Sequence, residues 1–181
     1  MVKRTTVEKS PYSESLSEAG FYVYRGELPD ELSAQLILRG QEAANRANPR
    51  DNARFRDFET VRAMLDDKTT SVYALQHKHA LAGVVTLTHN PLHNLWNNSD
   101  VEFSMKTFGQ YGQDSAIAVN FAQASLFDQE DTTGVSVDMW AEVPTADSVA
   151  IKRHRKVGFS VLGSDQMVTL VRRGEENRLT S

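Results

Sequence analysis

A chain of 181 residues, of which 40% are hydrophobic and 24% charged, has the size and composition of one soluble globular domain. The absence of cysteine excludes disulfide bonds, a thiol nucleophile and thiolate-bound metal, and no apolar run is long enough to span a membrane. The net charge of −4 argues against nucleic acid as a partner, because phosphate backbones bind to basic surfaces.

The first third of the chain predicts an arm, one strand and two helices. Residues 1–19 are polar and show no period, which is typical of a flexible arm. The aromatic and β-branched run FYVYR at 21–25 predicts the first strand. A helix should follow, because leucines recur every four residues from Leu28 to Leu36. A turn-rich segment at 45–52 separates it from a second helix, whose apolar positions are Phe55, Phe58, Val61 and Leu65.

The middle of the chain changes to a period of two residues. The runs at 71–76 and 81–88 predict two antiparallel strands joined by a short polar hairpin. After a loop at 89–99, residues 100–106 predict another strand, because apolar and polar positions alternate there. The apolar positions are Val101, Phe103 and Met105, and the polar ones include Glu102 and Ser104.

The last part of the chain alternates helix and strand. The segment 115–127 is nearly free of charge, which favours a helix packed against a sheet. The elements expected after it are a polar break at 128–134, a strand at 135–143, a basic helix from Asp147, and strands at 160–163 and 166–172. This order predicts a single α/β (α+β) domain with a mixed sheet over residues 20–173, followed by a charged tail at 174–181.

The segment DSVAIKRHRKVGF at 147–159 carries the sharpest motif. It resembles the late motif of the GNAT superfamily of acyl-CoA N-acyltransferases, which reads Asn-x-x-Ala-Ile-x-x-Tyr-x-Lys-x-Gly-Phe. The matching residues are Ala150, Ile151, Lys156, Gly158 and Phe159, whereas Asp147 replaces the asparagine and His154 the tyrosine. The resemblance extends over roughly residues 20–172. It implies a largely antiparallel mixed sheet flanked by helices, with a V-shaped opening between the fourth and fifth strands.

The family's pyrophosphate loop, Arg/Gln-x-x-Gly-x-Gly/Ala, is present here in altered form. Alignment on Gly112 places Thr107 at the Arg/Gln position and Gln110 at the first glycine, with a glycine shifted to Gly109. Backbone N–H groups ahead of a helix can still bind an anion there. The resemblance implies acetyl-CoA as co-substrate, held by Phe103, Met105, Thr107, Phe108, Gly109, Gln110, Tyr111, Gly112, Gln113, Asp147 and Ala150.

The resemblance also implies an N-acetyltransferase that transfers the acetyl group directly. Glu102 would accept the proton of the attacking amine, with Asp100 as the fallback. His154 would donate a proton to the departing coenzyme sulfur. Two simpler interpretations stay open: Glu102 is a surface carboxylate or pairs with Lys106 or an arginine, and His154 is an exposed member of a basic helix face.

The acceptor implied by the resemblance is a primary amine, on a small molecule or a protein. The alternative is a catalytically inactive module of the same fold that binds coenzyme A or a protein partner. We expect no nucleic acid, no membrane and a cytoplasmic location, because the sequence also begins without a secretory signal. We expect no metal either, since the histidine pairs 77/79 and 89/93 lack a third ligand nearby in sequence. The oligomeric state is open, and a homodimer is common among relatives.

Overall fold

A single mixed sheet of eight strands organises the chain, as seen in a computed structural model that describes residues 4–44, 54, 56–89, 101–134 and 136–174. The strand order is β1-β2-β3-β4-β5-β6-β8-β7. Every neighbouring pair is antiparallel except β5 and β6, which run parallel. The prediction of a mixed, largely antiparallel sheet flanked by helices is confirmed.

The elements follow one another in two halves that meet at β5. The first half contains β1 (Thr5–Thr6), α1 (Pro11–Glu18), β2 (Phe21–Arg25), α2 (Asp30–Ala44), α4 (Phe58–Asp66), β3 (Thr70–His77) and β4 (Ala80–His89). The second contains β5 (Val101–Thr107), the 3-10 turn η1 (Gly109–Gln113), α5 (Ser115–Thr133), β6 (Met139–Pro144), α6 (Ser148–Lys156), β7 (Ser160–Ser164) and β8 (Met167–Arg172).

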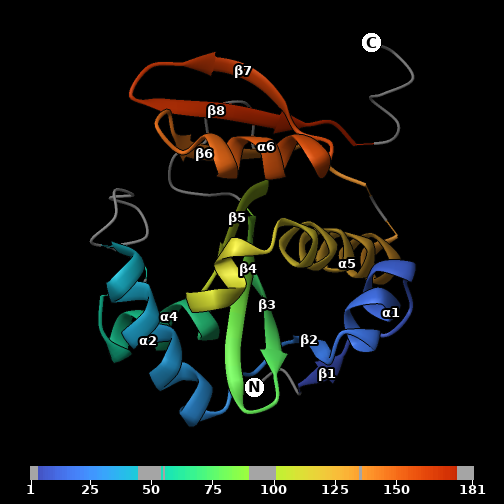
Figure 1. The fold of residues 1–181 in the computed structure, drawn as a ribbon, viewed down its shortest axis with the longest axis vertical. Coiled ribbons are helices and arrows are strands. Elements are labelled where there is room, and N and C mark those ends of the chain that lie inside the picture. Colours follow the sequence, from blue (N-terminus) through green and yellow to red (C-terminus); the bar gives the residue numbers. More distant parts are fainter. Residues whose placement is uncertain (1–3, 45–53, 55, 90–100, 135, 175–181) are drawn as a thin grey trace.

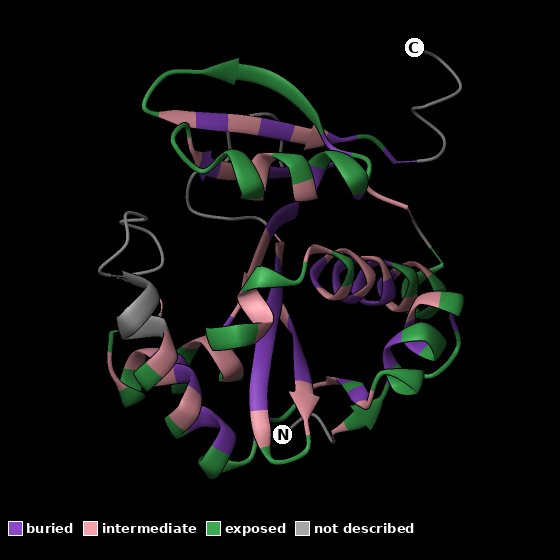
Figure 2. Ribbon diagram, viewed as in Figure 1, coloured by how far each residue is buried: buried purple, intermediate pink, exposed green. Residues whose placement is uncertain are grey.

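Helices cover both faces of the central strands (Figure 1). Successive side chains of a strand point to opposite faces, so β3 supplies Tyr73 and Leu75 to one core and Val72 and Ala74 to the other. The first core includes residues of α1 and α5, and the second includes residues of α2 and α4. Strands buried on both sides read as nearly continuous apolar runs. Figure 2 shows β4 buried along most of its length.

The N-terminal segment is folded, and the prediction of a flexible arm over residues 1–19 is wrong for the part described. Helix α1 begins with a capping box in which Ser10 and Ser13 satisfy each other's backbone N–H groups. Leu16 is 1% exposed, and α1 packs against α5. Tyr12 and Leu16 are the only large apolar side chains of this short helix that reach the core, and two positions are too weak a periodic signal. Ser10 followed by Pro11 is nevertheless typical of a helix start.

Helix α5 also runs further than the sequence predicts. It continues through the expected polar break at 128–134 to Thr133 and ends at Gly134, whose φ of 67° is left-handed. Its last turns can be polar because their side chains form hydrogen bonds with residues of the sheet. Arg25 Nη1 and the Tyr73 hydroxyl each donate to Asp128 over 3.0 Å. Burial, followed by the neighbouring Asp128 charge, raises the pKa of Tyr73, which therefore stays a donor.

Strands β5 and β6 separate soon after they meet. Their parallel pairing is confined to Val101 with Met139 and Glu102 with Trp140. Beyond these pairs the two strands diverge, and β5 continues beside β4 while β6 pairs with β8 (Figure 1). The opening that the family resemblance implies is therefore present in this fold. β6 begins at Met139, four residues later than the predicted strand start at 135.

Gly83 tests how tightly this junction is packed. A Cβ atom there would lie 2.8 Å from the Lys106 carbonyl oxygen and 3.2 Å from the Phe121 ring. We expect Gly83→Ala to lower the free energy of unfolding by about 1–3 kcal/mol, since β4 would have to move away from β5. Gly163→Ala on β7 is the matched control, because no atom lies within 4 Å of its Cβ position. Urea unfolding of both variants measures the difference, and equal midpoints would contradict this reading of the junction.

Candidate functional site

Two adjoining clefts open where β5 and β6 diverge. The smaller has a volume of about 50 Å³ and reaches Arg54, Glu102, Ser104 and Glu142. The larger has a volume of about 620 Å³ and extends along the glycine loop to Arg39 and Arg153. Residues common to both linings are Met105, Lys106, Pro144, Asp147, Ala150 and His154. The clefts therefore form one continuous site at the point where the sheet splits.

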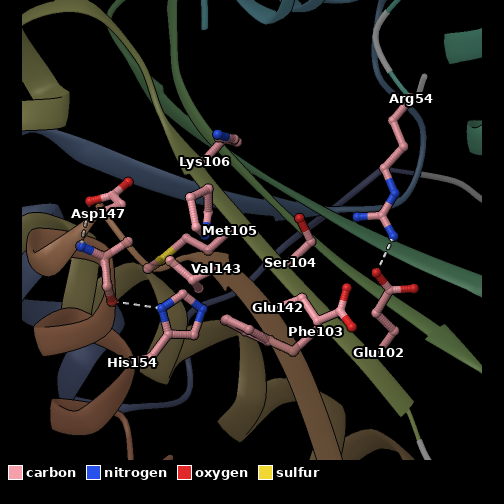
Figure 3. Close-up of a pocket in the computed structure, with 12 residues that line it drawn as sticks. Arg54, Glu102, Phe103, Ser104, Met105, Lys106, Glu142, Val143, Asp147 and His154 are labelled. Atoms are coloured by element: carbon pink, nitrogen blue, oxygen red, sulfur yellow. Dashed lines mark hydrogen bonds and ion pairs between the residues drawn. The ribbon is translucent and has the colours of Figure 1, made fainter. Parts of the chain in front are cut away.

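Glu102 lies on β5 with its side chain toward the α2 and α4 face. Its neighbour Phe103 points to the opposite face, where it joins the core beside α5. Glu102 is only 7% exposed, and its Oε1 accepts a hydrogen bond of 2.5 Å from Arg54 Nη2 (Figure 3). The interpretation of a surface carboxylate is wrong, and the pairing with an arginine is confirmed. The fallback residue Asp100 lies outside the described residues.

Glu142 is a second carboxylate in the smaller cleft that sequence reasoning missed. It comes from β6, and Figure 3 shows it beside Glu102. Its strand neighbours Ala141 and Val143 belong to the core on the other face. The period of two along β6 could have indicated the direction of its side chain, but only the parallel pairing of β5 with β6 in the folded sheet brings it near Glu102.

His154 is buried in the wall of both clefts. It is 4% exposed, and its ring meets the edges of Phe103 and Phe159 at centroid distances of 5.6 Å and 5.4 Å. Its Nδ1 lies 2.7 Å from the Ala150 carbonyl oxygen, which can only accept, so Nδ1 carries a proton (Figure 3). Burial lowers the pKa of His154 below 6.5 against the smaller upward effect of that hydrogen bond. The interpretation as an exposed helix-face residue is wrong.

The predicted coenzyme residues are distributed unevenly around the larger cleft. Phe103 on β5 lines only the smaller cleft, whereas Met105 on β5 and Asp147 and Ala150 at the start of α6 line both clefts. Asp147 caps α6 by accepting from the Ala150 N–H over 3.0 Å. Of the loop residues, those that line the larger cleft are Thr107, Phe108, Gly109, Gly112 and Gln113.

Two loop residues that were predicted to hold the coenzyme, Gln110 and Tyr111, do not line the larger cleft. Gln110 is exposed, and the Tyr111 hydroxyl lies 3.1 Å from His77 Nδ1 on β3. The Tyr111 N–H donates to the Phe108 carbonyl within the loop. Gly109 has a φ of 57°, which explains why a glycine stands one position earlier than the family pattern has it.

Helix α5 already holds a carboxylate at its N-terminus. Asp114 is the N-cap residue, and its Oδ1 accepts from the Ala116 N–H over 3.0 Å and from the Ile117 N–H over 3.2 Å. These first-turn N–H groups are the donors that a helix offers to an anion. The capping carboxylate therefore occupies two first-turn N–H groups of α5, directly after the loop where the family resemblance places the diphosphate.

Cationic side chains surround the larger cleft. Arg39 comes from α2, Lys106 from β5 and Arg153 from α6. Arg153 Nη2 donates to the Gly112 carbonyl over 2.6 Å, and its Nε lies 3.1 Å from the Ser115 hydroxyl. Sequence analysis treated Arg153 only as part of a basic run, and nothing near Arg39 in the sequence distinguishes it.

Neither a metal centre nor a membrane helix emerges from the described part of the chain. Among those residues, no three His, Cys, Asp or Glu side chains gather closely enough to hold a metal ion. None of the described helices has both the length and the apolar character needed to cross a membrane.

Comparison with known proteins rests on structure alone, because no protein-family model and no curated protein matches the sequence. A ribosomal-protein-S5-alanine acetyltransferase from Vibrio fischeri has a TM-score of 0.65 at 12% identity, covering 87% of this chain and 94% of its own. The PaiA N-acetyltransferase from Thermoplasma acidophilum, in complex with coenzyme A, has a TM-score of 0.60 at 14% identity, covering 83% and 98%. An aminoglycoside N(6')acetyltransferase from Legionella pneumophila has a TM-score of 0.60 at 8% identity, covering 88% and 96%.

These structures share the architecture and little of the sequence. Each is matched over more than 90% of its own length, so the likeness concerns whole domains. At such low identity a common architecture does not carry a common substrate. The described sheet, its divergent strands and the helices on both faces are together the GNAT fold, which this chain shares with these acetyltransferase structures.

Proposed function

We propose that this protein is an N-acetyltransferase that moves an acetyl group from acetyl-CoA directly to a primary amine. The observation that carries the proposal is the pair of adjoining clefts at the divergence of β5 and β6. Glu102 lines the smaller cleft, and His154 lines both this cleft and the larger one along the glycine loop. Two solved structures of the same fold support it by their names, one as an acetyltransferase and one in complex with coenzyme A.

The proposed reaction needs a neutral amine near the thioester. Glu102 takes the proton from the acceptor's ammonium group, directly or through water, and its pairing with Arg54 fixes the carboxylate in place. The amine nitrogen then attacks the thioester carbon, so that a C–N bond forms, the C–S bond breaks and the coenzyme leaves as a thiolate. The nitrogen releases its remaining extra proton to water as the amide forms. Holding both reactants between β5 and β6 supplies much of the rate through orientation.

His154 is the proposed donor of the proton that the departing thiolate takes up. In its neutral form this ring carries its proton on Nδ1, which is bonded to Ala150, so Nε2 can only accept. Donation from Nε2 therefore requires the imidazolium form. Because burial lowers the pKa of His154, that form is scarce at neutral pH and becomes populated in acid.

The second candidate is an inactive module that keeps the fold and binds coenzyme A or a protein. Two observations favour it: Asp114 occupies the first-turn N–H groups of α5, and His154 is buried with its Nδ1 engaged. The inactive module would bind coenzyme A or a protein without turnover, whereas the enzyme would also transfer the acetyl group.

Calorimetric titration with acetyl-CoA, followed by a thiol-release assay on a panel of small amines and peptides, tests the proposal. We expect binding of acetyl-CoA and release of coenzyme thiol with at least one amine. Absence of binding would end the proposal. Binding without thiol release on any acceptor would instead support the inactive module.

Replacement of Glu102 tests the proposed base. Glu102→Gln keeps the shape of the side chain but cannot accept the amine proton, so we expect kcat to fall about 10²- to 10⁴-fold. The Kd for acetyl-CoA should stay within a factor of about three, because the carboxylate faces the acceptor. Glu59→Gln on the exposed surface of α4 is the control. An unchanged kcat in Glu102→Gln would remove the base assignment.

The pH dependence of turnover tests the proposed acid. If imidazolium donates the proton, kcat of the wild type should decline as pH rises through the lowered pKa of His154. His154→Phe should lose that decline and show a lower kcat throughout. Stopped-flow thiol release between pH 5 and 8 measures both profiles, and identical profiles would contradict a role for His154 in proton transfer.

The same histidine should couple stability to pH. The unfolded chain binds a proton at His154 near the ordinary pKa of 6.5, whereas the folded chain does so only at lower pH. The contribution of neutral His154 to the free energy of unfolding is therefore fully present above pH 6.5. It is lost as the pH falls from there through the pKa of His154 in the folded protein. His154→Phe should flatten this loss, since the ring lies against Phe103 and Phe159 and an apolar ring suits those surroundings. Urea unfolding of the wild type and His154→Phe at pH 7.5 and pH 5.5 measures this change in the free energy of unfolding. An equal decrease in both proteins would show that other groups cause the pH dependence.

A further inference from the structure

The larger cleft must neutralise phosphate without the usual helix donors. Asp114 engages the Ala116 and Ile117 N–H groups, and its carboxylate adds a negative charge at the entrance to α5. A second anion placed at the same N–H groups would meet both a lack of donors and repulsion from this charge. Phosphate groups in this cleft therefore need positive charge from another source.

Two arginines from separate helices lie where that charge is needed. A Cβ atom on Gly109 would come within 2.8 Å of Arg39 Nη1, so the α2 guanidinium reaches the start of the glycine loop. Arg153 reaches the other end of the loop from α6, where it contacts the Gly112 carbonyl and the Ser115 hydroxyl. Both side chains are half-buried and border the larger cleft. The loop thus runs between two guanidinium groups.

We infer that the diphosphate of the coenzyme is held by Arg39 and Arg153, one from each side of the glycine loop, in place of the first-turn N–H groups of α5. The inference rests on the proposed function and names the groups that would bind its co-substrate. A guanidinium has five N–H donors in a planar fork, and the two recorded bonds of Arg153 use two nitrogen atoms. Such a fork suits phosphate oxygens in pairs.

The altered loop is consistent with this arrangement. The family pattern has an arginine or glutamine where Thr107 stands here, and that lost donor is replaced from outside the loop. Gly109 has a left-handed φ of 57°, and its missing side chain leaves room for the Arg39 guanidinium beside the loop. Arg153 has a further effect, since its bonds to Gly112 and Ser115 join the loop to α6 before any ligand binds.

Calorimetric titration of coenzyme A and of dephospho-coenzyme A, which lacks only the 3'-phosphate, tests the inference. We expect Arg39→Gln and Arg153→Gln each to weaken both ligands about 10- to 100-fold, the range for a charge-assisted hydrogen bond. Arg155→Gln is the matched control, since Arg155 lies on α6 but is exposed and does not border the larger cleft. It should leave both affinities within a factor of about two.

A variant that binds more tightly is a useful test, because a disturbed fold would weaken binding rather than strengthen it. Asp114→Asn preserves a good N-cap side chain but removes the negative charge, so it should tighten coenzyme A binding about two- to tenfold. Arg153→Lys retains the charge but not the fork, and it should bind with an affinity between those of the wild type and Arg153→Gln. Circular dichroism and urea midpoints confirm that each variant is folded.

The outcomes separate this inference from the proposed function. If the wild type does not bind coenzyme A, the proposed function fails. If the wild type binds but both arginine variants bind as tightly, the function stands and the inference is overturned. Weakening of coenzyme A alone, with dephospho-coenzyme A unaffected, would place the arginines at the 3'-phosphate and also overturn the diphosphate assignment. Unchanged binding by Asp114→Asn would show that its carboxylate does not keep anions from α5.

Discussion

The short parallel contact between β5 and β6 is the constraint that creates the two adjoining clefts of the candidate site. Only two residue pairs join the strands, and past Glu102 and Trp140 each strand continues with a different neighbour. A sheet that stayed closed would fill this place with ladder hydrogen bonds and side chains. Because it opens, the walls of a cleft are built from strand edges whose positions are held by the two halves of the sheet.

The opening collects its side chains from both faces of the sheet. Glu102 and Glu142 lie on the face covered by α2 and α4, whereas Phe103 turns the other way and packs against His154. An acyl group between the strands would therefore have a carboxylate on one side and an imidazole on the other. This arrangement follows from the period of two along β5, so the proposed base and acid need no special backbone geometry.

Charge in the site is arranged locally, although the protein as a whole is acidic. Arg54 pairs with Glu102 in the smaller cleft, while Arg39 and Arg153 flank the glycine loop in the larger one. Asp114, in turn, stabilises the start of α5 by capping two of its first-turn N–H groups. The net charge of −4 contains no information on where arginines from three distant segments lie around these clefts.

The sequence by itself determined the elements and their order, because hydrophobic period and turn chemistry are local. The leucines from Leu28 to Leu36 predicted α2, and the alternation around Phe103 predicted β5. The local pattern gave the wrong secondary structure where contacts with residues distant in sequence stabilise a helix. Residues 5–18 fold because Leu16 finds a core beside α5, and the end of α5 stays helical because Asp128 meets Arg25 and Tyr73.

The site divides in the same way. Residue types along one strand or one helix indicated Glu102, His154 and the glycine loop, since each belongs to a continuous motif. Tertiary structure alone decided that His154 is buried and that Glu142 stands beside Glu102. It also decided that Arg39, more than a hundred residues from Arg153, borders the same cleft. Burial and the meeting of charges depend on how the sheet diverges, and no window of neighbouring residues contains that geometry.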